Sequence, residues 1–167
     1  FGKSSFQNMA KGGVEVRGKL ELNDVVICNN NTKNSGAGVY VANGGEVIMN
    51  GGAVYNNRSA LRGGGICVSD ATLTISGTNI YNNKAANHGG GIYVQNKSLV
   101  SLKSGKVTKN RSDANGDGIY ILSADSQVKI AESFYLGGND IKVDNVNAVV
   151  KFTGKSMKYH SASDPVL

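Results

Sequence analysis

The chain has 167 residues, of which 40% are hydrophobic and 18% are charged, and its net charge is +6. Its 23 glycines exclude a fold built of long helices, because an interior helical glycine costs roughly 1 kcal/mol, and its apolar content is too high for a disordered chain. No nucleic-acid motif occurs, and no apolar run approaches the ~20 residues of a membrane span, so we expect neither a nucleic-acid partner nor a membrane-spanning segment.

A glycine-rich motif followed by alternating apolar residues returns along the chain. It reads GAGVYV at 36–41, GGGICV at 63–68, GGGIYV at 89–94 and GDGIYI at 116–121. The repeat is about 26 residues long, which is the range of solenoid repeats. Weaker copies place Val14 before the series and Ile141 after it. The apolar–x–apolar pattern is typical of a strand with one buried face.

Two further apolar series follow the glycine motif within each period. One consists of pairs such as Leu73 and Ile75, and the other of single residues such as Ile80. Three short strands per repeat predict a coil in which each strand lies parallel to its equivalent in the next turn. We therefore expect an all-β fold, a single-stranded, right-handed parallel β-helix (solenoid) of about six coils. It should occupy residues 1–154, with 155–167 as a C-terminal cap or linker.

An asparagine stands three residues after the third apolar position of each repeat. These residues are Asn30, Asn57, Asn83, Asn110 and, in a degenerate copy, Asn139. One asparagine per coil at a fixed place predicts an internal ladder, in which each side-chain amide bonds the next and satisfies buried backbone groups of the turn.

The repeats resemble those of a known family of bacterial surface proteins. VYNNRSALRGGGI at 54–66, IYNNKAANHGGGI at 80–92 and VTKNRSDANGDGI at 107–119 each join an apolar-x-x-Asn element to a glycine motif. This is similar to the F-x-x-N / G-G-A-I repeat of the chlamydial polymorphic outer-membrane proteins. Most copies here carry Gly in place of Ala, and Val or Ile in place of Phe.

The resemblance implies an adhesin or stalk segment displayed at the cell surface, outside the cell. Its partner would be a glycan or a protein on a host or neighbouring cell. The chain begins within the pattern, at SSFQN (4–8), so we expect it to be part of a larger multidomain protein.

Catalysis is a competing interpretation, because parallel β-helices also include polysaccharide lyases and glycosidases. Such enzymes need clustered carboxylates on one face. At the outward positions of the first two strand series, no two carboxylates fall on neighbouring turns, and we expect the short loops to form no walls of a cleft. We therefore expect a non-catalytic rod without cofactor or metal. The alternative is a carbohydrate-binding module for acidic glycans.

Aromatic residues occupy outward positions of the first strand series. Tyr40, Tyr93 and Tyr120 share a stripe with Cys67, whereas Cys28 falls on a different face. The tyrosines are candidates for stacking on a sugar or anchoring a partner, or they stack on one another and shield the sheet. The cysteines are expected to be two free thiols at outer positions, without a disulfide.

A basic residue follows the ladder asparagine in three successive turns. Arg58, Lys84 and Arg111 should stack as a ridge. Such a ridge is a candidate site for an anionic ligand such as an acidic glycan, or it is a row of solvated charges that guards against edge pairing.

The loop DANGDG at 113–118 matches the start of an EF-hand calcium loop. The match stops there, because Ala124 stands at the twelfth position, where that loop needs a glutamate. Ordinary turn chemistry of Asn, Asp and Gly accounts for the same residues without a metal.

Overall fold

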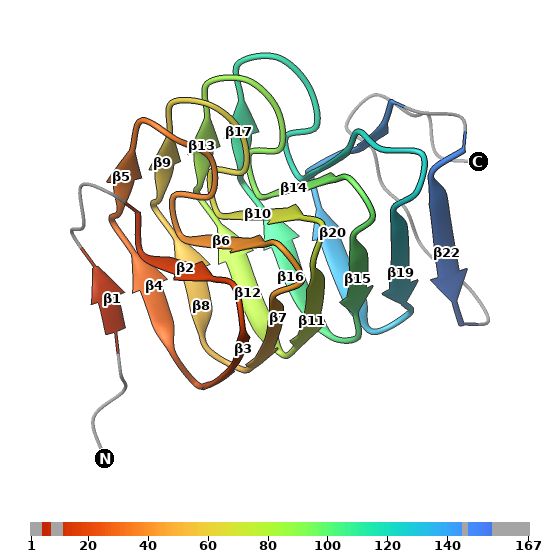
Figure 1. Ribbon diagram of the computed structural model, residues 1–167, viewed down its shortest axis with the longest axis horizontal. Coiled ribbons are helices and arrows are strands. Elements are labelled where there is room, and N and C mark those ends of the chain that lie inside the picture. The colour runs from red at the N-terminus through yellow and green to blue at the C-terminus, as the bar shows by residue number, and fades with distance from the viewer. Residues whose placement is uncertain (1–4, 8–11, 145–146, 155–167) are drawn as a thin grey trace.

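The computed structural model describes residues 5–7, 12–144 and 147–154. Within them the chain is a coil of short strands, β1 to β22 (Figure 1). Each strand pairs in parallel with its equivalent one turn earlier or later. Strands β1 and β22 lie at opposite ends of the stack. The predicted parallel β-helix is confirmed. The proposed cap at 155–167 lies outside the described residues.

Three sheets of six strands each form the walls of the coil. The first sheet contains β2 (Val14–Val16), β6 (Val39–Ala42), β10 (Ile66–Ser69), β14 (Ile92–Gln95), β18 (Ile119–Ile121) and β21 (Ile141–Val143). The second contains β3 (Lys19–Asn23), β7 (Glu46–Asn50), β11 (Thr72–Ser76), β15 (Leu99–Leu102), β19 (Gln127–Ala131) and β22 (Val149–Thr153). The third contains β1 (Ser5–Gln7), β4 (Val26–Cys28), β8 (Ala53–Tyr55), β12 (Thr78–Tyr81), β16 (Gly105–Thr108) and β20 (Phe134–Gly137).

A fourth, narrow sheet adds one strand to the three per repeat that the sequence predicts. It contains β5 (Asn31–Thr32), β9 (Arg58–Ser59), β13 (Lys84–Ala85) and β17 (Arg111–Ser112). These strands have two residues each, which is too short for any apolar alternation to show in the sequence. About five turns are complete, from β2 to β20, and β21 and β22 begin a sixth.

The core is a continuous column of apolar side chains from the first three sheets. In a single turn, Ile66, Leu73, Ile75 and Ile80 are fully buried. Each stacks on its equivalents in the neighbouring turns, so every turn depends on the next to bury its apolar face.

The predicted asparagine ladder is present and buried. Asn30 Nδ2 donates to Asn57 Oδ1, Asn57 Nδ2 to Asn83 Oδ1, and Asn83 Nδ2 to Asn110 Oδ1, each at 2.9 Å. Asn110 Nδ2 donates to Asn139 Oδ1 at 3.0 Å. The same amides donate to strand carbonyls, such as that of Val54 from Asn83. They therefore satisfy backbone groups that water cannot reach.

The glycine motif serves two conformational needs. Gly89 has φ of +68°, a left-handed conformation that side chains rarely adopt. Gly91 lies against the next turn, where a Cβ atom would stand 2.6 Å from the Gly118 carbonyl oxygen. An alanine at position 91 would therefore clash with the turn that follows.

Candidate functional site

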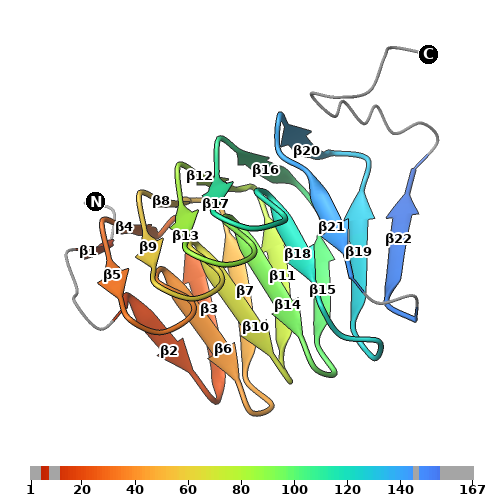
Figure 2. The same ribbon diagram turned by 90° about the horizontal axis from the view of Figure 1, so that it is seen from above.

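The predicted basic ridge lies along the fourth sheet. Arg58 pairs with Lys84, and Lys84 pairs with Arg111, so these residues stack at one-turn spacing as predicted. The strands that carry them line up along one edge of the coil (Figure 2). Each basic residue directly follows a ladder asparagine. Because the asparagines repeat once per turn, the basic residues that follow them also stack.

One carboxylate partly neutralises the ridge. Asp113 Oδ1 lies 2.9 Å from Lys84 Nζ and 3.8 Å from Arg111 Nε. The hydrogen bond from Lys84, together with the neighbouring positive charges, holds the pKa of Asp113 below its usual value. An anion at the ridge would therefore meet a carboxylate beside two of its three cations.

The tyrosine stripe lies on the outer face of the first sheet, where register stacks Tyr40, Cys67, Tyr93 and Tyr120. The rings of Tyr93 and Tyr120 are parallel, with centroids 5.6 Å apart. Only 1% of Tyr93 and 3% of Tyr120 is exposed. At these two positions, the side chains point outward from the sheet but are still shielded from solvent.

Loop side chains cover these two rings. The Arg62 guanidinium lies 5.4 Å from the Tyr93 ring centroid, and the His88 ring stacks on Tyr120 at 4.3 Å. Arg62 lies in the loop before β10 and covers a ring on β14. His88 lies in the loop before β14 and covers a ring on β18. Each loop therefore covers the ring that lies one turn further along the coil. Tyr93 and Tyr120, both predicted as ligand-binding residues, have no open ring face. The shielding interpretation describes their packing.

The cysteines form no disulfide, as predicted, but both are buried. The expectation that they lie at open outer positions is wrong. Cys67 is fully buried between Tyr40 and Tyr93 in the stripe. The loops whose side chains cover the tyrosine stripe carry no apolar periodicity, so the sequence pattern does not predict this burial.

Burial raises the pKa of the Cys67 thiol to about 12. We expect it not to react with a disulfide reagent such as DTNB at pH 8 until the protein unfolds, since the thiolate is the reactive form.

Folding raises the pKa of the Cys67 thiol, so the protein should lose stability at alkaline pH. The contribution of the neutral thiol to the free energy of unfolding is fully present below the pKa of the unfolded thiol. It falls as the pH rises toward 12. Urea titrations at pH 7 and pH 10 should show a smaller alkaline loss for Cys67→Ala. Rapid labelling of the native Cys67 thiol would contradict the burial.

The two carboxylates of the loop at 113–118 have separate partners. Asp117 Oδ1 accepts hydrogen bonds from the Ser112 backbone N–H at 2.7 Å and from the Ser112 hydroxyl at 3.1 Å. Asp113 is paired with the ridge. Asp117 thus closes its own turn, which is the turn chemistry that Asn, Asp and Gly provide. Across the described residues, no three His, Cys, Asp or Glu side chains gather as a metal site would require.

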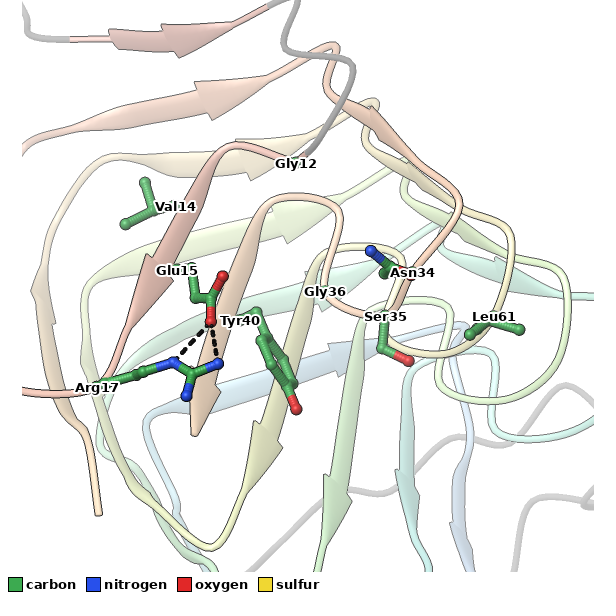
Figure 3. Close-up of a pocket in the computed structure, with 9 residues that line it drawn as sticks. All are labelled: Gly12, Val14, Glu15, Arg17, Asn34, Ser35, Gly36, Tyr40 and Leu61. Atoms are coloured by element: carbon green, nitrogen blue, oxygen red, sulfur yellow. Dashed lines mark hydrogen bonds and ion pairs between the residues drawn. The ribbon is translucent and has the colours of Figure 1, made fainter. Parts of the chain in front are cut away.

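A pocket of about 570 Å³ opens at the N-terminal end of the tyrosine stripe. Figure 3 shows the Tyr40 ring with the Glu15–Arg17 pair on one side and with Asn34, Ser35 and Leu61 on the other. Tyr40 is half-buried and packs against the Cys67–Tyr93–Tyr120 cluster. The expectation that the loops form no walls is therefore wrong here, because the loop from β5 to β6 provides one.

The first turn departs from the repeat spacing on the N-terminal side of this pocket. Phe6 and Val14 are eight positions apart, whereas their partners in the next turn, Ile27 and Val39, are twelve apart. The segment before β2 is therefore four residues shorter than the segment between β4 and β6.

Comparison with known proteins identifies the fold family. The family described as "Right handed beta helix region" matches residues 1–135. No curated protein and no solved structure matches the chain significantly. No helix in the described part of the chain is long and apolar enough to cross a membrane. The predicted handedness agrees with the family, and the chain belongs to the right-handed β-helix family.

Proposed function

We propose that the chain is a non-catalytic, rigid segment of an extracellular surface protein, a β-helical rod that makes or presents adhesive contacts. The observation that carries the proposal is the unbroken run of parallel pairs and ladder amides through the described turns. Neighbouring turns share their core, their sheets and their amide ladder, which stiffens the coil along its axis. The resemblance of the repeats to chlamydial polymorphic outer-membrane proteins supports placement at the cell surface.

The outward carboxylates support a non-catalytic function. Glu15 is paired with Arg17 at 2.8 Å, Glu46 with Lys19 at 3.2 Å, and Asp113 with Lys84. Glu15 lies on β2, Glu46 on β7 and Asp113 in the loop after β17. Glycoside hydrolysis needs instead two carboxyl groups that flank one bond.

A second candidate is binding of acidic glycans by the ridge. The one-turn stacking of Arg58, Lys84 and Arg111 favours it, because a regular row of cations suits a regularly charged polymer. The pairing of Asp113 with two of these cations weakens it.

Two measurements test the proposed function. Antibodies against the chain are expected to label intact cells that carry the protein, and labelling that requires permeabilisation would overturn the surface location. Beads coated with the chain are expected to adhere saturably to neighbouring or host cells, whereas beads coated with heat-unfolded chain are not. If the ridge provides adhesion, Arg58→Ala with Arg111→Ala should abolish it and salt should weaken it.

A further inference from the structure

Four Asn-x-Ser/Thr triplets occur in the chain, and each has the acceptor sequence for N-linked glycosylation. They begin at Asn30, Asn57, Asn96 and Asn110. The triplets themselves do not distinguish one asparagine from another, since each has a hydroxyl residue two positions further on. The structure does distinguish them, by the burial and the hydrogen bonds of the asparagine amide.

Three of the four asparagines belong to the ladder, and their amides are fully bonded. Asn30, Asn57 and Asn110 are 1%, 1% and 4% exposed. An asparagine amide has two N–H groups to donate. Asn57 Nδ2 donates one to the Ile27 carbonyl and the other to Asn83 Oδ1, and Asn30 and Asn110 each donate in the same way. A sugar on any of these nitrogens would replace a hydrogen that the ladder uses.

Asn96 differs from the ladder asparagines in both place and bonding. It is exposed and lies in the turn between β14 and β15, at a corner of the coil (Figure 2). Within the described residues, Asn96 Nδ2 has one acceptor, Ser69 Oγ at 2.8 Å. The second N–H can therefore be replaced by a sugar while the bond to Ser69 remains.

We propose that Asn96 carries an N-linked glycan. The donor is an oligosaccharide joined to a lipid diphosphate, and the transfer forms a bond between Asn96 Nδ2 and C1 of the first sugar. The bond between C1 and the diphosphate oxygen breaks, and the lipid diphosphate leaves with its electron pair. Nδ2 loses one proton to a base of the transferase and keeps the other.

The transfer must precede closure of the turn. Ser98, whose hydroxyl completes the triplet, is fully buried, and its Oγ donates to the Gln95 carbonyl at 2.6 Å. A transferase that recognises this hydroxyl therefore acts on the chain before it folds. The ladder triplets are also open at that stage, but a chain with a sugar at Asn57 cannot close the ladder. Folded molecules should therefore carry the glycan at Asn96 alone.

A shallow groove beside the turn gives the glycan a surface to lie on. The groove has a volume of about 170 Å³, and Leu99, Thr72 and Gln127 are among the residues that line it. Leu99 is 48% exposed and follows Asn96 by three residues, which span at most about 11 Å. The C–H groups of a sugar can cover Leu99 while its hydroxyls bond Thr72 and Gln127. An attached glycan would thus shield an exposed apolar side chain from water.

A glycan at Asn96 rests on the proposed extracellular location, because this modification is made on chains that are secreted. The test is mass spectrometry of intact proteolytic glycopeptides from the full protein, recovered from its own cells. We expect the peptide that contains Asn96 to carry a glycan in most molecules, and the peptides of the ladder asparagines to carry none. Asn96→Gln, expressed in the same cells, should lose the glycan completely.

Asp70→Asn is the matched variant that adds a site. Asp70 is exposed, has φ of +51° and occupies the equivalent turn one coil earlier. With Ala71 and Thr72 the substitution completes an Asn-Ala-Thr triplet, so this variant should gain a second glycan. Both variants change exposed turn residues and should keep the fold, which urea unfolding midpoints check.

Three results would overturn the inference: an unmodified Asn96 in protein recovered from the cell surface, a glycan on a ladder asparagine of folded protein, or no added glycan on Asp70→Asn. None of these results affects the surface labelling or the bead adhesion, so the glycan can fail while the proposed function stands. A glycan at Asn96 on a protein whose coated beads do not adhere would separate the two in the other direction.

Discussion

Asn83→Ala is expected to lower the free energy of unfolding by about 3–5 kcal/mol. Asn83 is 1% exposed and sits in the middle of the ladder. Its Oδ1 accepts from both the backbone N–H and the side-chain amide of Asn57, at 3.0 and 2.9 Å, and its Nδ2 donates to the Val54 carbonyl. The alanine removes all of these bonds. The Asn57 side-chain amide then keeps only its bond to the Ile27 carbonyl, and each buried group left unsatisfied costs about 1–3 kcal/mol.

The measurement is urea unfolding at pH 7, with hydrogen exchange of the neighbouring turns. Asn87→Ala is the matched control, because Asn87 is an exposed loop residue four positions further along the chain, and it should change stability by less than about 0.5 kcal/mol. We expect the backbone amide of Asn57 to lose its exchange protection first. Equal stabilities of the two variants would mean that the ladder is not a structural support.

The repeat architecture could be predicted from the sequence because it depends on local periodicity and on one residue type per turn. Ile66 and Ile92 fall into register because each glycine motif restarts the same pattern, and the asparagines follow from the same period. Burial of the tyrosine stripe could not be read this way. Whether Tyr93 faces solvent depends on where Arg62 lies, and that contact joins a loop to the strand one turn further on.

The candidate site shows the same division between what is local and what is not. The stacking of Arg58, Lys84 and Arg111 follows from the register of the turns, and the sequence predicts it. Asp113 changes the charge of that ridge from a loop position that carries no repeat signal. The pocket at Tyr40 is lined by residues of three successive turns, and a search for what recurs does not detect such a combination.

Gly91→Ala carries the second large expected effect, a loss of about 1–3 kcal/mol from overpacking between turns. The added methyl carbon would lie 2.6 Å from the Gly118 carbonyl oxygen, 3.0 Å from Asn110 Nδ2 and 3.1 Å from Val107 Cγ1. None of these atoms can easily move, because the carbonyl accepts from the Ile92 N–H at 2.8 Å and the amide belongs to the ladder. The methyl group must therefore widen the spacing between two turns.

Gly18→Ala makes the same chemical change at a position where nothing lies within 4 Å of the added carbon. It should be neutral or slightly stabilising, because alanine restricts the unfolded chain more than glycine does. Urea midpoints of the two variants, measured side by side, isolate the steric effect at Gly91 from the general effect of replacing glycine. A difference below about 0.5 kcal/mol, the scatter of ordinary surface substitutions, would mean that the turns can separate at little cost. The coil would then be less stiff along its axis than a rod that carries adhesive contacts requires.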